Sequence, residues 1–248
     1  MRYLIHACPR RMWYVEEFIV PSLRAQGIRE DEIEIWNDAE GKGNLFSCME
    51  SFRACGERAK ENPESGTWHL QDDILICRDF AERTRELDDG IVCGYCCKNF
   101  GNFLQERGRQ PVIFLWYSFP CIRIPDRIAG ECAEWFFTRA VKREKWKKEV
   151  EQGKSDDWFF RNFLHEQRSD MTVLQLDKAL VEHVDWLIGG TIVNPQRTWK
   201  QTRAAFWQDE ELVKELEEKL NARNSPPKGQ LRKLVEAVDK GRTDDSGM

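Results

Sequence analysis

The 248-residue sequence has no apolar run long enough to span a membrane. Its longest strongly apolar run, residues 112–119, is far shorter than the ~20 residues that a spanning helix needs. The first six residues lead directly into a strand-like pattern and lack the apolar centre of a signal peptide. We therefore expect a cytoplasmic protein with no membrane partner.

The sequence also lacks a second close cysteine pair. Cys93, Cys96 and Cys97 form the only dense group among nine cysteines, and a zinc ribbon needs another pair to complete a tetrahedral site. Without an export signal, disulfides are not expected either. Buried thiols in a strand and its turn are the favoured interpretation, with a metal at this cluster as the alternative.

The sequence has no general excess of positive charge. It contains 38 Lys and Arg and 43 Asp and Glu, for a net charge of -5. This balance excludes a uniformly basic nucleic-acid binder. One stretch, residues 139–148, has six cations and one anion, a local +5 that leaves -10 for the remainder. It is either a solvated helix face or a surface for DNA phosphates. Its cations are Arg139, Lys142, Arg143, Lys145, Lys147 and Lys148.

Composition and patterning predict an α/β fold. The 11% of aromatic residues, with ten Trp, argue against disorder. The first eighty residues read strand, helix, strand, helix, strand, which is typical of a parallel sheet flanked by helices, as in Rossmann-like folds. The strands are expected at 3–8, 32–36 and 67–71, and the helices at 13–26 and 45–59.

The rest of the chain is less regular. Strands are expected at 90–95, 112–117, 173–176 and 180–184, and helices at 132–148, 158–164 and 209–222. We predict one domain over 1–222, ending in a helical extension, and a tail over 223–248 that is partly helical and partly disordered.

Two carboxylates, Asp72 and Asp73, follow the third strand, at the sheet edge where ligands of open α/β folds bind. Adjacent buried carboxylates are costly unless a cation neutralises them, and Mg²⁺ or Mn²⁺ would do so. An exposed turn is the alternative. His183 follows a late strand and is either a metal ligand or a structural histidine.

A second acidic pair, Asp156 and Asp157, opens the helix expected at 158–164. One of the two can cap the helix, which is the structural explanation. The other would then remain available as a proton acceptor.

Together these residues resemble nucleotide-sugar-dependent glycosyltransferases of the GT-A fold, over roughly residues 1–210. The sequences at 68–74 and 77–80 look most like the phage and prophage branch called TET-associated glycosyltransferases. That branch is thought to add sugars to hydroxymethylated pyrimidines in DNA. Gln71 stands where many members carry an acidic residue.

The resemblance implies a role for each matching residue. It implies that Asp73 and His183 bind Mn²⁺ or Mg²⁺, and that Asp157, or Asp156, is the base of an inverting hexosyl or pentosyl transfer. Asp72 would hold the ribose or a metal-bound water. The donor is expected to be a UDP-sugar. The residues that would line its pocket are Ala7, Cys8, Arg10, Asp38, Asn44, Gln71 and Asp72.

Three acceptor hypotheses remain open. Double-stranded DNA with hydroxymethylated bases agrees with the branch resemblance and with the basic stretch 139–148. A cell-surface glycan or cell-wall precursor is the second hypothesis. The third is a non-catalytic binding module on a GT-A scaffold.

Overall fold

A computed structural model describes residues 1–41, 43–87, 90–96, 119–151, 156–176, 178–189, 204 and 207–224. The chain divides into two compact units, Met1–Gln208 and Asp209–Met248. None of the helices within the described ranges is long and apolar enough to cross a membrane.

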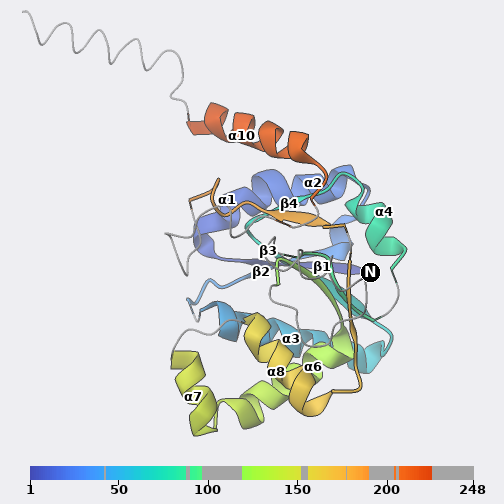
Figure 1. Cartoon of the computed structure of the whole chain (residues 1–248), viewed down its shortest axis with the longest axis vertical. Coiled ribbons are helices and arrows are strands. Elements are labelled where there is room, and N and C mark those ends of the chain that lie inside the picture. The colour runs from blue at the N-terminus through green and yellow to red at the C-terminus, as the bar shows by residue number, and fades with distance from the viewer. Residues whose placement is uncertain are drawn as a thin grey trace, which may run out of the picture. The chain divides into compact units, whose positions relative to one another are not determined.

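A six-stranded sheet, in the order β2-β1-β3-β6-β5-β7, forms the centre of the first unit (Figure 1). β1 is parallel to β2 and β3, and β5 is parallel to β7, whereas β6 is antiparallel to its two neighbours. The predicted α/β fold with a mostly parallel, Rossmann-like sheet is therefore confirmed. The strands are β1 (Arg2–Ala7), β2 (Ile33–Asn37), β3 (Gly66–Gln71), β5 (Ile91–Cys93), β6 (Cys121–Pro125) and β7 (Val173–Gln175).

Side chains alternate between the two faces of β3. Trp68 packs toward α4 (Phe80–Arg85), where its ring lies 6.2 Å from that of Phe80. His69 points to the opposite face, where its ring lies 4.9 Å from that of Phe52 in α3 (Asn44–Glu61). Because successive side chains point to opposite faces and both faces are covered, the middle of β3 is buried on both sides.

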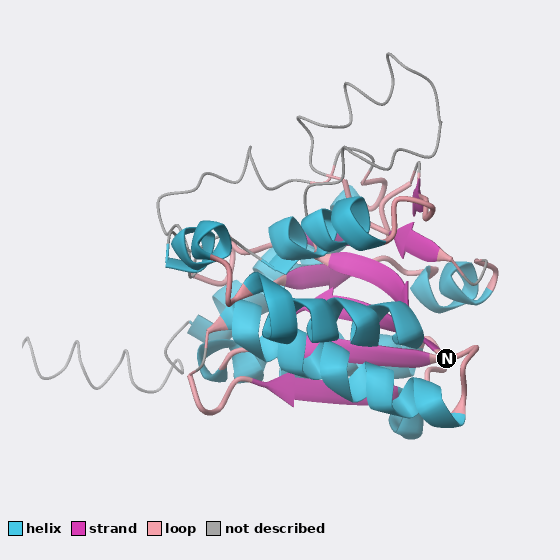
Figure 2. Ribbon diagram, turned by 90° about the horizontal axis from the view of Figure 1, so that it is seen from below, coloured by secondary structure: helices cyan, strands magenta, loops and turns pink. Residues whose placement is uncertain are grey.

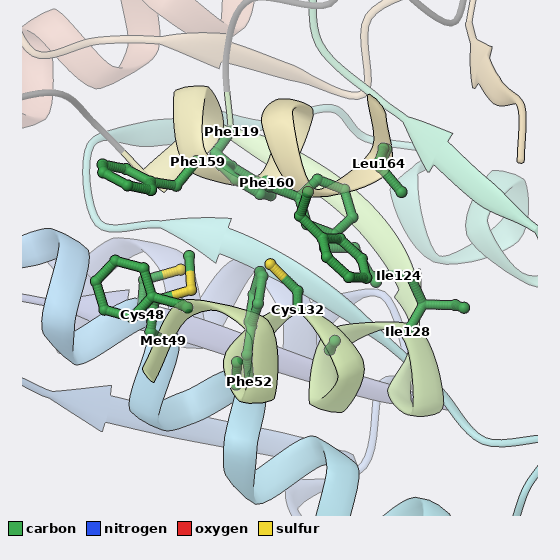
Figure 3. Packing of buried hydrophobic residues seen from close by; sticks show 14 of the residues in the cluster. Cys48, Met49, Phe52, Phe119, Ile124, Ile128, Cys132, Phe159, Phe160 and Leu164 are labelled. Atoms are coloured by element: carbon green, nitrogen blue, oxygen red, sulfur yellow. The ribbon is translucent and has the colours of Figure 1, made fainter. Parts of the chain in front are cut away.

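The face of the sheet occupied by α3 holds the main apolar cluster, together with α6 (Asp126–Trp135) and α8 (Asp156–Gln167). Figure 2 shows helices covering this face of the sheet, and Figure 3 shows the apolar side chains packed there. Phe52 contacts Phe160 at 5.8 Å between ring centroids, so α8 is tied through α3 to the sheet. This packing holds α8 on the same side of the sheet as α3.

Helices α3 and α6 approach closely at two glycines. A Cβ atom on Gly56 would lie 2.6 Å from the Cα of Gly130, and one on Gly130 would lie 2.5 Å from the Cα of Gly56. Because both obstacles are backbone atoms, a side chain at either position forces the helices apart.

We expect Gly56→Ala to lower the free energy of unfolding by about 1–3 kcal/mol, since the added methyl group overpacks this crossing. Denaturant unfolding followed by circular dichroism measures the change. Gly90→Ala is the matched control, because a Cβ there meets no atom within 4 Å. Equal midpoints for the two variants would contradict the close crossing.

The helix expected at 13–26 is present but irregular. It is built from η1 (Pro9–Arg11), α1 (Met12–Tyr14), the π-helical η2 (Val15–Ile19) and α2 (Val20–Ala25). Pro21 lies in α2 and has no N–H to donate, so the wider π turns directly before it accommodate its ring.

The segment expected to be helical, 132–148, is helical except at residues 141–143. The chain forms α6, then the π-helical η4 (Phe136–Ala140), a turn, and α7 (Glu144–Glu151). Thr138 Oγ1 donates to the carbonyl of Glu134 at 2.6 Å, and such bonds from a side chain to the preceding turn distort helices.

The remaining predicted elements agree to within a few residues where they are described, whereas β4 (Ile74–Ile76), α4 and β6 were not predicted. A second, two-stranded sheet pairs β4 with β8 (Val181–His183) in antiparallel fashion. The second unit contains α10 (Glu210–Asn224), where a helix is expected at 209–222. The strand expected at 112–117 and most of the tail at 223–248 lie outside the described residues, and the domain boundary after 222 stays a prediction.

Candidate functional site

The carboxyl ends of β1 and β3 place Cys8 beside Asp72. The parallel register aligns His6 with Gln71, so the residues just after the two strands are neighbours. The backbone N–H of Cys8 donates to Asp72 Oδ2 at 2.7 Å. Asp72 is therefore a buried, hydrogen-bonded carboxylate at the sheet edge, and the exposed-turn alternative is wrong.

Arg11, which the sequence does not single out, is the cation of this site. Its side chain is buried, and Nη1 donates to Asp72 Oδ1 at 2.9 Å and to Asp73 Oδ2 at 2.5 Å. Arg11 ends the short helix η1, one turn after β1. Arg10, the arginine expected in the donor pocket, is exposed.

The second sheet brings His183 to Asp73, although the two are distant in sequence. Ile74 is aligned with His183 across β4 and β8, and the N–H of Val184 donates to the carbonyl of Asp73 at 2.8 Å. His183 Nε2 lies 3.1 Å from Asp73 Oδ1. The buried carboxylate of Glu182 anchors β8 by accepting from the N–H groups of His183 and Ala204.

Asp73 and His183 fit neighbouring positions on one divalent ion. Two ligand atoms at adjacent corners of an octahedron, with bonds of about 2.1 Å, are about 3.0 Å apart. The observed separation is 3.1 Å, and Asp73 Oδ1 is buried without a well-oriented hydrogen bond from the described residues. The described part of the chain holds no group of three or more His, Cys, Asp or Glu suited to a metal. Further ligands would have to come from a bound molecule or water.

The two aspartates differ in electrostatics. Burial opposes ionisation of both, and the charge of Asp73 adds to this effect at Asp72, whose pKa is raised. At Asp73 the effect of burial is outweighed by His183 and Arg11, so its pKa is lowered. For Arg11, burial is likewise outweighed by Asp73 and Asp72, and its pKa is raised. Asp73 is thus ionised, as a carboxylate that binds a metal must be.

The remaining donor-pocket candidates lie around this edge. Ala7 is buried, and its carbonyl accepts the N–H of Asp38 at 3.0 Å. Asp38 Oδ2 accepts the N–H of Gly43 at 2.9 Å, so this carboxylate shapes the glycine loop before α3. Gln71 is half-buried, and Asn44 is exposed in the first turn of α3.

Asp156 and Asp157 begin α8, as expected. Asp156 is buried beside Cys48 in α3, and burial together with the charge of Asp157 raises its pKa to about 7. Asp157 is half-buried, and its Oδ1 accepts the N–H of Trp158 at 2.7 Å. Because α3 follows the carboxyl end of β2, both aspartates lie toward the sheet edge that carries Asp73.

No protein-family model matches the chain, and no curated protein matches it significantly. The function must therefore be argued from the site itself.

The basic stretch lies on η4, the following turn and α7. Its cations Arg139, Lys142, Arg143, Lys147 and Lys148 are exposed, and Lys145 is part of α7. Trp146 points inward instead, where its ring lies 5.7 Å from that of Trp135. Arg143 contacts Glu166 at 3.4 Å, a surface pair that holds the arginine only weakly.

The cysteine cluster gives no sign of a metal within the described residues. Cys93 and Cys96 are buried, and Cys93 Sγ lies 3.0 Å from the carbonyl of Tyr95, to which it donates. The cysteines of the described ranges form no disulfide. Cys97 lies outside these ranges.

Proposed function

We propose that this protein is a divalent-metal-dependent glycosyltransferase that moves a sugar from a nucleotide-sugar, expected to be a UDP-sugar, to a hydroxyl acceptor. The observation that carries the proposal is the meeting of Asp73 and His183 at the carboxyl end of β3, at 3.1 Å. Mg²⁺ and similar ions use one or two protein ligands together with substrate phosphates, so this two-ligand site suits a diphosphate. The imidazole makes Mn²⁺ the better first probe.

The fold supports the same proposal. Three features agree with a GT-A fold. The strands β1, β2 and β3 are parallel, and two aspartates follow β3 directly. The small β4–β8 sheet brings His183 close to these aspartates. The resemblance to TET-associated glycosyltransferases rests on Gln71, Asp72 and Asp73 and their neighbours, and stays part of the proposal.

In the proposed reaction the bond between the sugar's anomeric carbon and a diphosphate oxygen breaks, and a bond from the same carbon to the acceptor oxygen forms. The nucleoside diphosphate is the leaving group. A divalent ion held by Asp73 and His183 would supply stabilisation of the charge that develops on the diphosphate. The acceptor hydroxyl loses its proton as it attacks, and Asp157 would accept that proton at its carboxylate. Before the donor binds, the N–H of Cys8 and the guanidinium of Arg11 hold Asp72 beside this centre.

For the acceptor, we propose double-stranded DNA carrying 5-hydroxymethylpyrimidines. The exposed cations of the basic stretch support a phosphate-binding role, because Lys and Arg displace the counterions of DNA. A base hydroxymethyl group is either reached from the major groove or presented by flipping.

A screen tests donor and acceptor together. A panel of nucleotide-sugars is incubated with Mn²⁺, the protein and a duplex containing hydroxymethylcytosine, and the DNA is read by mass. A mass gain of one sugar, absent with unmodified cytosine, supports the proposal. Donor hydrolysis without DNA modification would indicate a glycan acceptor, and no donor turnover with any sugar would favour a binding module.

We expect binding to duplex DNA to weaken steeply with salt. Substitution of Lys142, Lys147 and Lys148 by Gln should flatten the slope of log K against log[salt] by about 0.9 for each DNA phosphate that the variant no longer neutralises. Fluorescence anisotropy at several salt concentrations measures the slope. Substitution of Lys60, Lys178 and Lys214, which lie outside this stretch, is the charge-matched control. An unchanged slope in the first variant would show that the basic stretch does not bind DNA.

A further inference from the structure

Arg11 occupies the carboxylates that a divalent ion would use. A single nitrogen, Nη1, donates to both Asp72 Oδ1 and Asp73 Oδ2, while the other oxygen of Asp73 faces His183. The arginine side chain is 7% exposed, so water screens this cluster poorly. Both Asp73 oxygens are therefore already in contact with side chains that can carry positive charge.

An ion entering this site meets the charge of Arg11 at close range. Two cations beside the same pair of carboxylates repel each other, and this repulsion is strong where water is excluded. Arg11 in this position consequently opposes metal binding in the absence of substrate. It also keeps Asp72 and Asp73 from facing one another as unpaired buried anions.

A diphosphate removes this conflict. The guanidinium group binds phosphate oxygens in the same paired geometry that it uses with carboxylates. Arg11 ends η1 at the carboxyl edge of β1, where ligands of open α/β sheets bind. A diphosphate there offers Arg11 a new anionic partner and offers the ion additional oxygen ligands.

We infer that Arg11 couples metal binding to diphosphate binding: without a diphosphate it holds Asp72 and Asp73 and keeps the metal affinity low, and a diphosphate draws it away and frees Asp73 for the ion. This inference rests on the proposed function, because it assumes the metal site of Asp73 and His183. It makes Arg11 a positioning residue that prevents ion uptake before the donor arrives.

Mn²⁺ binding, followed by electron paramagnetic resonance, tests the inference without any turnover. Pyrophosphate serves as the diphosphate probe, and thermal unfolding confirms that each variant is folded. The deciding variant is the double substitution Arg11→Gln with Asp72→Asn, which keeps the net charge of the wild-type cluster but removes the guanidinium from Asp73. Arg11→Gln alone would leave two adjacent buried carboxylates without their arginine, and this variant is not expected to fold. The double variant has only one of these carboxylates, so it is expected to fold.

Without pyrophosphate, we expect the double variant to bind Mn²⁺ at least about tenfold more tightly than the wild type, which is a typical size for coupling between two sites. Pyrophosphate should raise the Mn²⁺ affinity of the double variant less than that of the wild type. Arg24→Gln, which removes an exposed charge outside the cluster and outside the proposed donor pocket, is expected to change the Mn²⁺ affinity by less than about threefold.

Equal or weaker Mn²⁺ binding by the double variant would overturn the coupling role and leave the metal site intact. An effect of Arg24→Gln as large as that of the double variant would also overturn it, because the gain in Mn²⁺ affinity would then not depend on removing the guanidinium from Asp73. Absence of Mn²⁺ binding in all forms, with and without pyrophosphate, would instead refute the metal site on which the proposed function depends.

Discussion

Asp73→Asn is expected to lower sugar transfer by on the order of 10³-fold and to abolish measurable Mn²⁺ binding. A metal at this position stabilises the charge of the departing diphosphate by several kcal/mol, and each 1.4 kcal/mol corresponds to about tenfold in rate. The amide keeps the size of the carboxylate but loses the anion that His183 and Arg11 stabilise. Initial rates with the donor found by the screen, and Mn²⁺ titration, measure the two losses.

The same site predicts the response to chelation. EDTA should abolish transfer by the wild type, and added Mn²⁺ should restore it. Asp170→Asn is the matched control, because Asp170 is an exposed aspartate that makes only a surface pair with Arg168 at 3.4 Å. Full activity of the wild type in EDTA, or of Asp73→Asn with added metal, would exclude a metal role for this residue.

Local sequence patterns predicted much of the described first unit, but not β4, α4 or the central strand β6. The apolar runs that became β1, β2 and β3, and the long amphipathic α3, are determined by near neighbours in the chain, so their periods are visible in the sequence. The break between η4 and α7 was missed because it depends on the side chain of Thr138 and on how bulky aromatics pack, and a helical period does not reveal either.

Only part of the site could be predicted, because sequence patterns reveal local structure but not contacts between distant segments. Asp73 and His183 were each recognisable at the end of a strand, but their contact depends on the pairing of β4 with β8, which the pattern did not indicate. Arg11 was missed although a signal existed. Two adjacent buried carboxylates require a cation, and an arginine close after β1 could supply it as well as a metal could.

Asp157→Asn is expected to reduce turnover by about 10² to 10⁴-fold, the usual contribution of a positioned general base. The affinity for the donor should change by less than about threefold, because this aspartate is proposed to face the acceptor. Asp157 is half-buried at the start of α8, whereas Asp156 is 5% exposed and lies against Cys48, so Asp157 is the one that an acceptor can reach. Single-turnover rates and donor titration separate the two effects.

Asp156→Asn is the matched control for this assignment, and it makes a different prediction about pH. Burial raises the pKa of Asp156 to about 7, so the folded protein keeps this carboxyl protonated at pH values where the unfolded chain ionises it, near pH 4. The free energy of unfolding should therefore fall as the pH rises from about 4 to about 7, and Asp156→Asn should remove that part of the decline.

Denaturant unfolding of the wild type and Asp156→Asn at several pH values measures this difference, while transfer by Asp156→Asn should stay within about tenfold of the wild type. A large loss of turnover in Asp156→Asn with little loss in Asp157→Asn would assign the base to the buried aspartate. The acceptor would then have to reach beneath the first turn of α8, next to Cys48, and α8 would have to move from α3 during the reaction. Loss of donor binding in Asp157→Asn would instead make Asp157 a donor ligand.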